Sequence, residues 1–334
     1  VWIMAYTTID KPTDYFNTKL WTGDGNSTQA ISGVGHQPDL VWIKNRNLSS
    51  GPNLFFDSVR GANKALVANN SNAEASVSGY LNSFDSDGFT VGNDGAVNGS
   101  GDTYCSWNWK AGGSASSNSN GSITSSVSAN ISAGFSIVKW TGNVTAGATV
   151  GHGLGVKPNF IIAKGLDVTE NWNTYDSVNG AGKYLILDTT SSVLSSGGRW
   201  NSTEPNSTVF TLGDSGNVNG NNNEHIAYCF TSIKGYSKFG SYTGNGDNDG
   251  TFVYTGFKVA VVICKKTSST GDWELYDNKR DGYNGGNIRI HPNDSAAEGG
   301  TGRLSLLSNG FKITNSSGNL NGSGDTFIYM AFAE

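Results

Sequence analysis

Aromatic residues that recur beside polar loops are the first candidates for chemistry in this chain. Trp21, Trp140 and Tyr242 each open an aromatic-Thr-Gly triplet that leads into glycine-, asparagine- or aspartate-rich sequence. Sugars have apolar faces that stack on flat aromatic rings. These three residues, together with Trp200 beside a loop, are therefore candidate carbohydrate-binding residues. The alternative is that a recurring aromatic residue belongs to the core of a small β domain.

Carboxylates also recur, directly after an aromatic residue, at Asp57, Asp176 and Asp277. Glycoside hydrolysis needs two carboxylates that flank one bond, and the spacing of the acidic residues shows no such pair. A carboxylate that recurs in every repeat favours a shared structural role, such as accepting backbone N–H groups at the end of a strand. We therefore predict no catalytic residues and no enzyme activity.

Metal-binding sequence patterns are weak. Asp247 and Asp249 lie in an Asp-Asn-Asp-Gly loop whose oxygens form a weak candidate calcium site, but the loop lacks the ligand spacing and the closing glutamate of an EF-hand. A tight turn is the alternative. The three cysteines have no metal or disulfide spacing and are predicted to be buried free thiols; they are Cys105, Cys229 and Cys264. No cofactor is expected.

Composition restricts the fold class and the partners. The 334 residues include 46 glycines, and 15% are charged, against about a quarter in an average domain. Glycine is unfavourable inside helices, and the charged faces of surface helices are missing, so an all-β protein is predicted. The net charge is −5 without a cluster of basic residues, which argues against nucleic acid as a partner. No apolar run approaches the roughly 20 residues of a membrane helix, so no membrane insertion is expected.

An internal repeat predicts the domain organisation. Each copy contains the aromatic-Thr-Gly triplet, an apolar run ending in lysine, the aromatic-Asp pair, a late phenylalanine, an Asn-Gly turn and a closing aromatic strand. The first and last aromatic residues are 88 positions apart in the first copy (21 to 109) and 90 in the others (140 to 230, 242 to 332). Residues 14–110, 134–232 and 233–334, here called units 1, 2 and 3, are each predicted to form an antiparallel β-sandwich, jelly-roll (lectin-like) or Ig-like.

Two segments lie outside the units. Residues 111–133 are rich in serine, glycine and asparagine, which predicts a flexible linker, while the spacing of Ile123, Val127 and Ile131 indicates as an alternative that part of it lies along a surface. Residues 1–13 are interpreted as the closing strand of a preceding repeat plus a connection, since the four residues Ile3, Met4, Ala5 and Tyr6 match the end of unit 3 (residues 329–332). This strand is the candidate for assembly with another chain.

The landmarks resemble a repeat domain family of virion and tail proteins of bacteriophages, especially marine phages. The similarity extends over residues 14–334. It is carried by the phrases Trp140-Thr-Gly-Asn143, Thr149-Val-Gly-His-Gly-Leu-Gly155, Pro158-Asn-Phe-Ile-Ile-Ala-Lys164, Phe252-Val-Tyr-Thr-Gly-Phe257, Ser86-Asp-Gly-Phe-Thr-Val-Gly92 and Phe327-Ile-Tyr-Met-Ala-Phe332. The resemblance implies a structural or host-adsorption role on a phage particle, located on the virion and outside the cell, and it brings no catalytic residues.

The sequence therefore leads to two hypotheses without catalysis; a third class, a polysaccharide-degrading tail spike, would require two facing carboxylates in a groove and is the least favoured. The first is a non-enzymatic tail fibre or spike segment that attaches by multivalent contacts to glycan on the host surface, with copies of itself, as a trimer or fibre, and other virion proteins as partners. The alternative is a purely architectural subunit of a fibre, a capsid decoration or an extracellular filament, assembled by β-strand pairing between chains.

Overall fold

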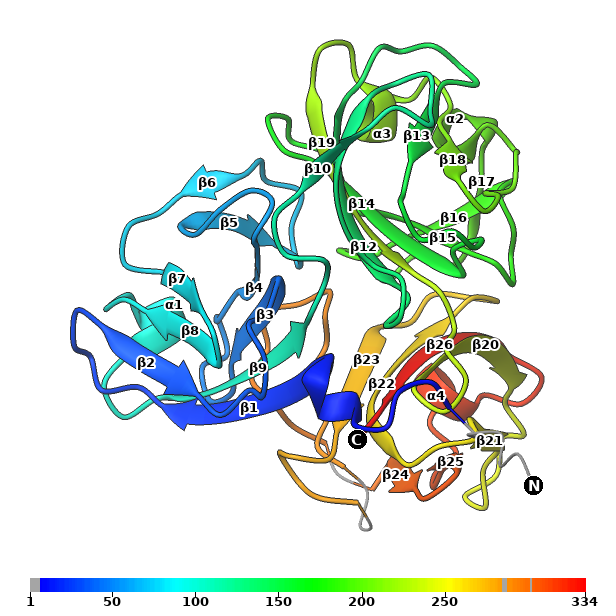
Figure 1. The fold of residues 1–334 in the computed structure, drawn as a ribbon. Helices are drawn as coiled ribbons and strands as arrows, with labels where there is room; N and C mark the ends of the chain where they lie inside the picture. The colour runs from blue at the N-terminus through cyan, green and yellow to red at the C-terminus, as the bar shows by residue number, and fades with distance from the viewer. Residues whose placement is uncertain (1–6, 284–286, 301) are drawn as a thin grey trace, which may run out of the picture.

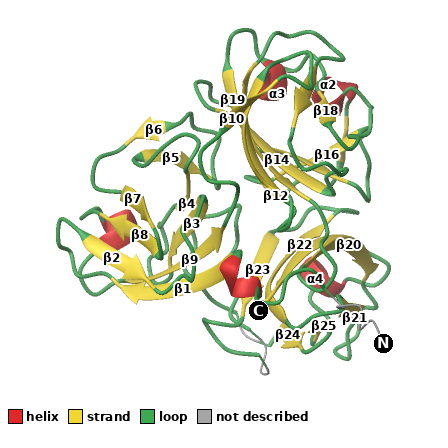
Figure 2. Cartoon of the chain, viewed as in Figure 1, coloured by secondary structure: helices red, strands yellow, loops and turns green. Residues whose placement is uncertain are grey.

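The computed structural model describes residues 7–283, 287–300 and 302–334 and consists almost entirely of antiparallel β-strands (Figure 1). The predicted all-β class is confirmed. The helices of the described residues are single turns (Figure 2), namely η1 (Pro12–Asp14), α1 (Gly95–Asn98), α2 (Gly197–Trp200), α3 (Gly216–Asn219) and α4 (Gly318–Asn321). The proposed assembly strand, Ile3 to Tyr6, lies outside the described residues.

Each unit supplies two sheets. In unit 1 the strands are β1 (Phe16–Thr22), β2 (Gln29–Ser32), β3 (Leu40–Asn45), β4 (Asn53–Asp57), β5 (Lys64–Val67), β6 (Ala75–Ser76), β7 (Leu81–Asp85), β8 (Gly88–Val91) and β9 (Thr103–Trp109). The larger sheet has the order β1-β9-β3-β4-β5-β6, and the smaller sheet has the order β2-β8-β7.

Unit 2 and the segment before it form the second pair of sheets. The strands are β10 (Ser116–Asn118), β11 (Ser125–Asn130), β12 (Phe135–Thr141), β13 (Thr149–Gly151), β14 (Phe160–Gly165), β15 (Asn173–Asp176), β16 (Lys183–Ile186), β17 (Leu194–Ser195), β18 (Val209–Thr211) and β19 (Glu224–Phe230). The larger sheet has the order β10-β11-β12-β19-β14-β15-β16-β17, and β13 pairs with β18.

Unit 3 forms the third pair. Its strands are β20 (Ser237–Thr243), β21 (Phe252–Tyr254), β22 (Val259–Lys266), β23 (Trp273–Asp277), β24 (Leu304–Leu307), β25 (Gly310–Ile313) and β26 (Thr326–Ala333). The two sheets have the orders β20-β26-β22-β23 and β21-β25-β24. In all three units the closing strand (β9, β19 or β26) therefore lies between the opening strand and the apolar strand.

The apolar strands are buried on both faces, and in β3 and β14 the side chains alternate between two cores. In β3, Val41 and Ile43 pack in the core of unit 1 with the smaller sheet, whereas Leu40 and Trp42 face a central core that includes residues of all three units. Strand β14 divides its side chains in the same way. Burial on both faces explains why these strands are continuous apolar runs in the sequence.

The larger sheets of the three units converge at the centre of the molecule (Figure 1), and the closing aromatic residues of the three units contact one another. The ring centroids of Trp109 and Phe230 are 6.2 Å apart, those of Trp109 and Phe332 are 5.7 Å apart, and those of Phe230 and Phe332 are 5.9 Å apart. All three pairs are edge-on, an arrangement that aromatic rings favour. The units thus share a central core in addition to the cores that units 1 and 2 form with their smaller sheets.

The prediction of a flexible linker at residues 111–133 is wrong. Strand β11 pairs with β12 over residues 126–130 and 135–139, and β10 pairs with β11, so the segment extends the sheet of unit 2. Val127 and Ile123 are buried in the core of that unit. Serine- and asparagine-rich sequence can form an edge strand when apolar side chains at alternate positions cover a neighbouring core.

In the described ranges no helix is long and apolar enough to span a membrane.

Candidate functional site

The aromatic residues proposed for sugar binding are packed side chains of the units. Trp140 and Tyr242 are 2% and 8% exposed, Trp200 is 1% exposed, and Trp21 is half-buried. Each triplet aromatic stacks on a ring of the closing strand; the pairs are Trp21–Tyr104 (5.3 Å), Trp140–His225 (5.4 Å) and Tyr242–Phe327 (4.9 Å). This placement corresponds to the core alternative, because the rings already face protein and not solvent.

The polar atoms of the triplet aromatics also have partners inside the protein. They donate to carbonyls of the short helices: Trp21 Nε1 to Val97 O (3.1 Å), Trp140 Nε1 to Val218 O (3.2 Å) and Tyr242 Oη to Leu320 O (2.9 Å). A hydrogen bond of this kind fixes the orientation of a buried Trp or Tyr. The recurrence of these aromatics is thus explained by one packing arrangement repeated three times.

The recurring asparagine before each closing strand organises the loop that follows the triplet. Asn98, Asn219 and Asn321 are fully buried at the ends of α1, α3 and α4. Each side-chain oxygen accepts from a backbone N–H of that loop, at Asp24 (2.9 Å), Asn143 (2.8 Å) and Asn245 (3.0 Å). The predicted Asn-Gly turn is therefore the end of a helical turn that holds the loop in place.

The recurring aspartates end β4, β15 and β23, the strands that pair with the apolar strands, and they accept backbone N–H groups, as predicted. Asp57 Oδ1 accepts from the backbone of Val59 (3.1 Å) and Arg60 (2.9 Å), and the same two bonds occur at Asp176 and Asp277. Burial raises the pKa of Asp176. These carboxylates therefore serve the fold at equivalent positions in all three units.

Two of the three aspartates also join neighbouring units. The hydroxyl of Tyr228 in unit 2 donates to Asp57 of unit 1 (2.8 Å), and the indole N–H of Trp107 in unit 1 donates to Asp277 of unit 3 (3.2 Å). In the closing strand of unit 3 the equivalent residue is Met330, which cannot donate. The interface between units 2 and 3 consequently lacks this bond.

Buried lysines at the ends of the apolar strands follow the same cyclic pattern. Each ammonium donates to a backbone carbonyl of the neighbouring unit: Lys44 to Ser295 (3.0 Å), Lys164 to Ser71 (3.1 Å) and Lys265 to Thr190 (3.1 Å). All three side chains are fully buried, and burial lowers the pKa of each to about 8. A buried amine of this kind can mark a catalytic site, but here its recurrence and its carbonyl partners indicate a structural role.

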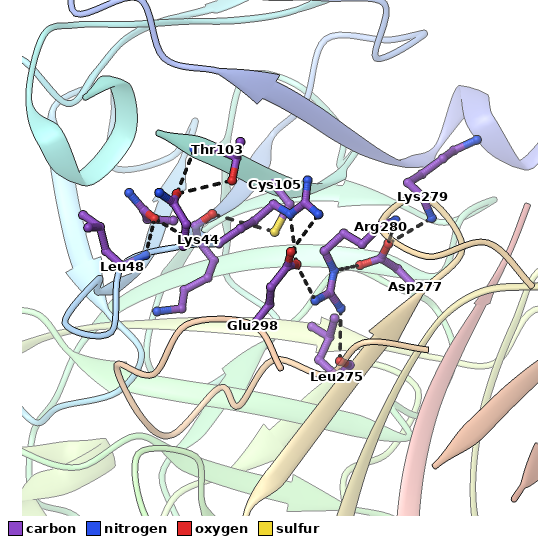
Figure 3. A network of polar contacts seen from close by, with 12 residues as sticks. Lys44, Leu48, Thr103, Cys105, Leu275, Asp277, Lys279, Arg280 and Glu298 are labelled. Atoms are coloured by element: carbon purple, nitrogen blue, oxygen red, sulfur yellow. Dashed lines mark hydrogen bonds and ion pairs between the residues drawn. The ribbon is translucent and has the colours of Figure 1, made fainter. Parts of the chain in front are cut away.

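An ion-pair network lies at the interface between units 1 and 3 (Figure 3). Arg46 holds Glu298 with two hydrogen bonds of 2.9 and 2.7 Å, and Arg280 lies between Glu298 (3.4 Å) and Asp277 (2.6 Å). Arg280 and Asp277 are fully buried, so removal of one partner would leave an uncompensated charge. This network orients the loop around residue 298 against unit 1.

The carboxylates of the candidate calcium loop form hydrogen bonds and an ion pair within the protein. The backbone N–H of Asp249 donates to Asp247 Oδ1 (3.0 Å), and the Asp249 carboxylate forms an ion pair with Lys312. These contacts correspond to the turn alternative.

The fold brings together two carboxylates and an imidazole that are far apart in type and spacing from any motif in the sequence. They belong to Asp272, Asp294 and His291. His291 Nδ1 is hydrogen-bonded to Asp294 (2.8 Å), and Asp272 accepts from Asn293 (2.9 Å). Burial alone would raise the pKa of Asp294, but the hydrogen bond with His291 and the positive charge of Lys44 lower it. The group is therefore engaged in the interface between units 1 and 3.

Two surfaces that the sequence did not single out are exposed to solvent. One is an open cleft of about 770 Å³ between unit 1 and strand β11, lined by residues that include His36, Lys110, Asn130 and Ile131. The other is strand β21, where Phe252 and Tyr254 are 46% and 55% exposed. The apolar-out alternation around buried Val253 was the available sequence signal for this strand.

These observations define an all-β protein in which paired antiparallel sheets surround one central aromatic core. The chain belongs to the family described as Domain of unknown function (DUF7483), whose model matches residues 11–334. No curated protein matches the chain.

Proposed function

We propose that the chain is a non-enzymatic structural protein of a bacteriophage particle, a segment of a tail fibre or spike that attaches to polysaccharide on the host surface. The phage assignment rests on the resemblance of the repeat landmarks to virion and tail proteins. The adhesive assignment rests on the way in which the three units differ.

The observation that carries the proposal is a constant interior combined with a variable exterior. The stacked aromatic pair, the buried asparagine, the aspartate and the lysine occupy equivalent positions in all three units. By contrast, the equivalent outer strands β2, β13 and β21 have the sequences Gln-Ala-Ile-Ser, Thr-Val-Gly and Phe-Val-Tyr. A rigid frame with variable surface segments is the usual arrangement in proteins that bind through their surface.

The buried ionisable groups at repeated positions support a role without catalysis. Asp57, Asp277 and the three buried lysines bind groups of a neighbouring unit and hold the units together. Such contacts suit a particle component that has to remain rigid outside the cell.

Binding of the purified full chain to polysaccharides and to host cells tests this function. We expect retention on at least one surface polysaccharide in affinity gel electrophoresis, and binding to cells that is lost when that polysaccharide is removed. If the chain binds no polysaccharide and no cell surface, also when it is displayed as an oligomer, the adhesive function is wrong.

The architectural alternative is favoured by the edge strands of the larger sheets. In the described residues β1 and β20 pair on one side only, and each is seven residues long. A second chain could add a strand at such an edge. Electron microscopy and the mass in solution, with and without residues 1–6, test this: assembly that depends on these residues would favour the alternative.

A further inference from the structure

Strand β21 exposes two aromatic rings on the same face of the smaller sheet of unit 3. Phe252 and Tyr254 are 46% and 55% exposed, while Val253 between them is 7% exposed and packs in the core. Alternate residues of a strand point to the same side, and they are about 6.6 Å apart along it. The two rings are thus neighbours on one surface.

The fold does not require aromatic residues at these two positions. Val253 pairs with Phe311, as Ile31 pairs with Phe89 in unit 1 and Val150 with Phe210 in unit 2, so the three strands are equivalent. The residues that flank the central one are Ala30 and Ser32 in unit 1, and Thr149 and Gly151 in unit 2. The smaller sheets of units 1 and 2 form with small residues at these positions, so formation of the sheet does not depend on the two rings.

Lys238 of strand β20 contacts strand β21 at Tyr254. Lys238 donates a hydrogen bond to the carbonyl of Tyr254 (2.7 Å), and its ammonium lies 5.4 Å from the centre of the Tyr254 ring. This contact occupies one backbone acceptor of β21 and places a positive charge beside the Tyr254 ring. In unit 2 the equivalent strand is instead covered by the preceding segment, through the hydrogen bond from Ile123 N to Thr149 O (3.0 Å).

The surroundings of the two rings are polar and balanced in charge. Lys312 pairs with Phe252 across the sheet and forms an ion pair with Asp249, and Asp247 is exposed in the loop before the strand. Together with Lys238 these residues supply two positive and two negative charges. Such a rim offers donors and acceptors to hydroxyl groups without favouring a charged ligand.

We propose that Phe252 and Tyr254 form a saccharide-binding platform for a neutral polysaccharide, with Lys238 and Asp249 as hydrogen-bonding residues at its rim. The apolar faces of two sugar rings stack on the aromatic rings, and the hydroxyl groups of the sugars bind the rim. The platform rests on the proposed attachment function and assigns its ligand class and its site.

The test replaces the two rings by their counterparts in unit 1. The full chain carrying Phe252→Ala and Tyr254→Ser is compared with the unchanged chain by affinity gel electrophoresis on neutral glucan, mannan and galactan and on acidic alginate. We expect the unchanged chain to bind a neutral polysaccharide, and the double substitution to weaken this binding about tenfold or more, because two aromatic contacts are removed. Urea unfolding checks that both proteins are equally folded.

Ile131→Ser is the matched control, since Ile131 is 63% exposed and lines the cleft beside unit 1. We expect it to bind like the unchanged chain.

Neutral-polysaccharide binding that survives the double substitution, or that is lost in the control instead, overturns the platform but leaves the attachment function standing. Binding to alginate alone overturns the neutral ligand class. If the unchanged chain binds none of these polysaccharides nor host cells, the attachment function itself fails. Self-association that the double substitution abolishes would make this surface a protein interface and overturn the platform.

Discussion

Lys164 donates a hydrogen bond from its ammonium to the backbone carbonyl of Ser71, 3.1 Å away, and so joins unit 2 to unit 1. Lys44 and Lys265 make the corresponding contacts to units 3 and 2. Burial disfavours the charged ammonium and lowers the pKa of all three lysines to about 8. The interfaces between units therefore contain groups whose protonation is coupled to folding.

We expect the free energy of unfolding to rise between pH 8 and pH 9. The folded chain releases the three lysine protons near pH 8, whereas the unfolded chain holds them up to about 10.5, so the unfolded state binds more protons in this range. Each lysine contributes at most about 1.4 kcal/mol per pH unit. Above pH 9 the rise is opposed, since burial raises the pKa of the cysteines and the unfolded state then loses thiol protons first.

Urea unfolding followed by tryptophan fluorescence at pH 7, 8 and 9 measures this slope. Lys164→Met removes one of the three groups, and its profile should rise less steeply than that of the unchanged chain. A stability that falls from pH 8 to pH 9 in the unchanged chain would contradict the assignment of these lysines.

Asp57→Asn should destabilise the chain much more than Asp176→Asn. Asp57 neutralises the fully buried Arg60 and accepts from Tyr228, so its loss leaves a buried guanidinium with weaker compensation. Removing one partner of a buried ion pair costs about 3–5 kcal/mol. Asp176 has the neutral Asn179 at the place of the arginine, so no buried positive charge loses its partner when the carboxylate is replaced by an amide. We expect a cost of about 1 kcal/mol.

Equilibrium unfolding at pH 7 compares the two variants. Equal losses would mean that the guanidinium of Arg60 is sufficiently compensated by Glu74, which lies 3.1 Å from it.

The repeat in the sequence was sufficient to predict the strands within a unit, because each landmark reports on local structure. The apolar runs form the central strands, and the aspartates accept backbone N–H groups at strand ends as expected. The contacts between units could not be predicted in the same way. The partner of Lys164 is 93 residues away, and no local pattern distinguishes a lysine that faces a neighbouring unit from one that faces solvent.

The residues of the candidate site were missed for a related reason. Recurrence drew attention to Trp140 and Tyr242, yet a side chain that recurs in every unit is one that the common fold requires. Phe252 and Tyr254 occur in one unit alone, where the frame does not need them. Composition was also misleading for residues 116–130, because strand pairing and the burial of Val127 determine their structure.

Gly142→Ala should destabilise the chain strongly. Gly142 belongs to the aromatic-Thr-Gly triplet, and a Cβ atom there would lie 2.4 Å from the carbonyl oxygen of Gly220. The backbone would have to move, at a cost of about 1–3 kcal/mol. Gly318→Ala is the control, since a Cβ atom there meets nothing within 4 Å and the residue begins the helical turn α4. We expect the control to be neutral or slightly stabilising in thermal unfolding, and a harmless Gly142→Ala would disprove the close approach.

His225 should make the chain sensitive to mild acid. Its ring stacks on Trp140, and burial lowers its pKa to about 4. Between pH 6.5 and pH 4 the unfolded chain protonates this histidine and the folded chain does not, so the free energy of unfolding falls as the pH falls. The loss is at most about 1.4 kcal/mol per pH unit for this residue.

The repeat provides the substitution that tests this, because unit 3 has Phe327 at the same position, stacked on Tyr242. His225→Phe keeps the stacking and removes the titrating group, together with the hydrogen bond from Gly220 N to Nε2 (3.1 Å). We expect the variant to be about 1 kcal/mol less stable at pH 7. Between pH 6.5 and pH 5 it should lose less stability than the unchanged chain, as measured by urea unfolding.

His36 and His152, whose pKa values burial also lowers, are present in both proteins, so the difference between the two profiles isolates His225. Parallel profiles would show that His225 titrates alike in the folded and unfolded chain, and the buried stacking would then not hold in solution.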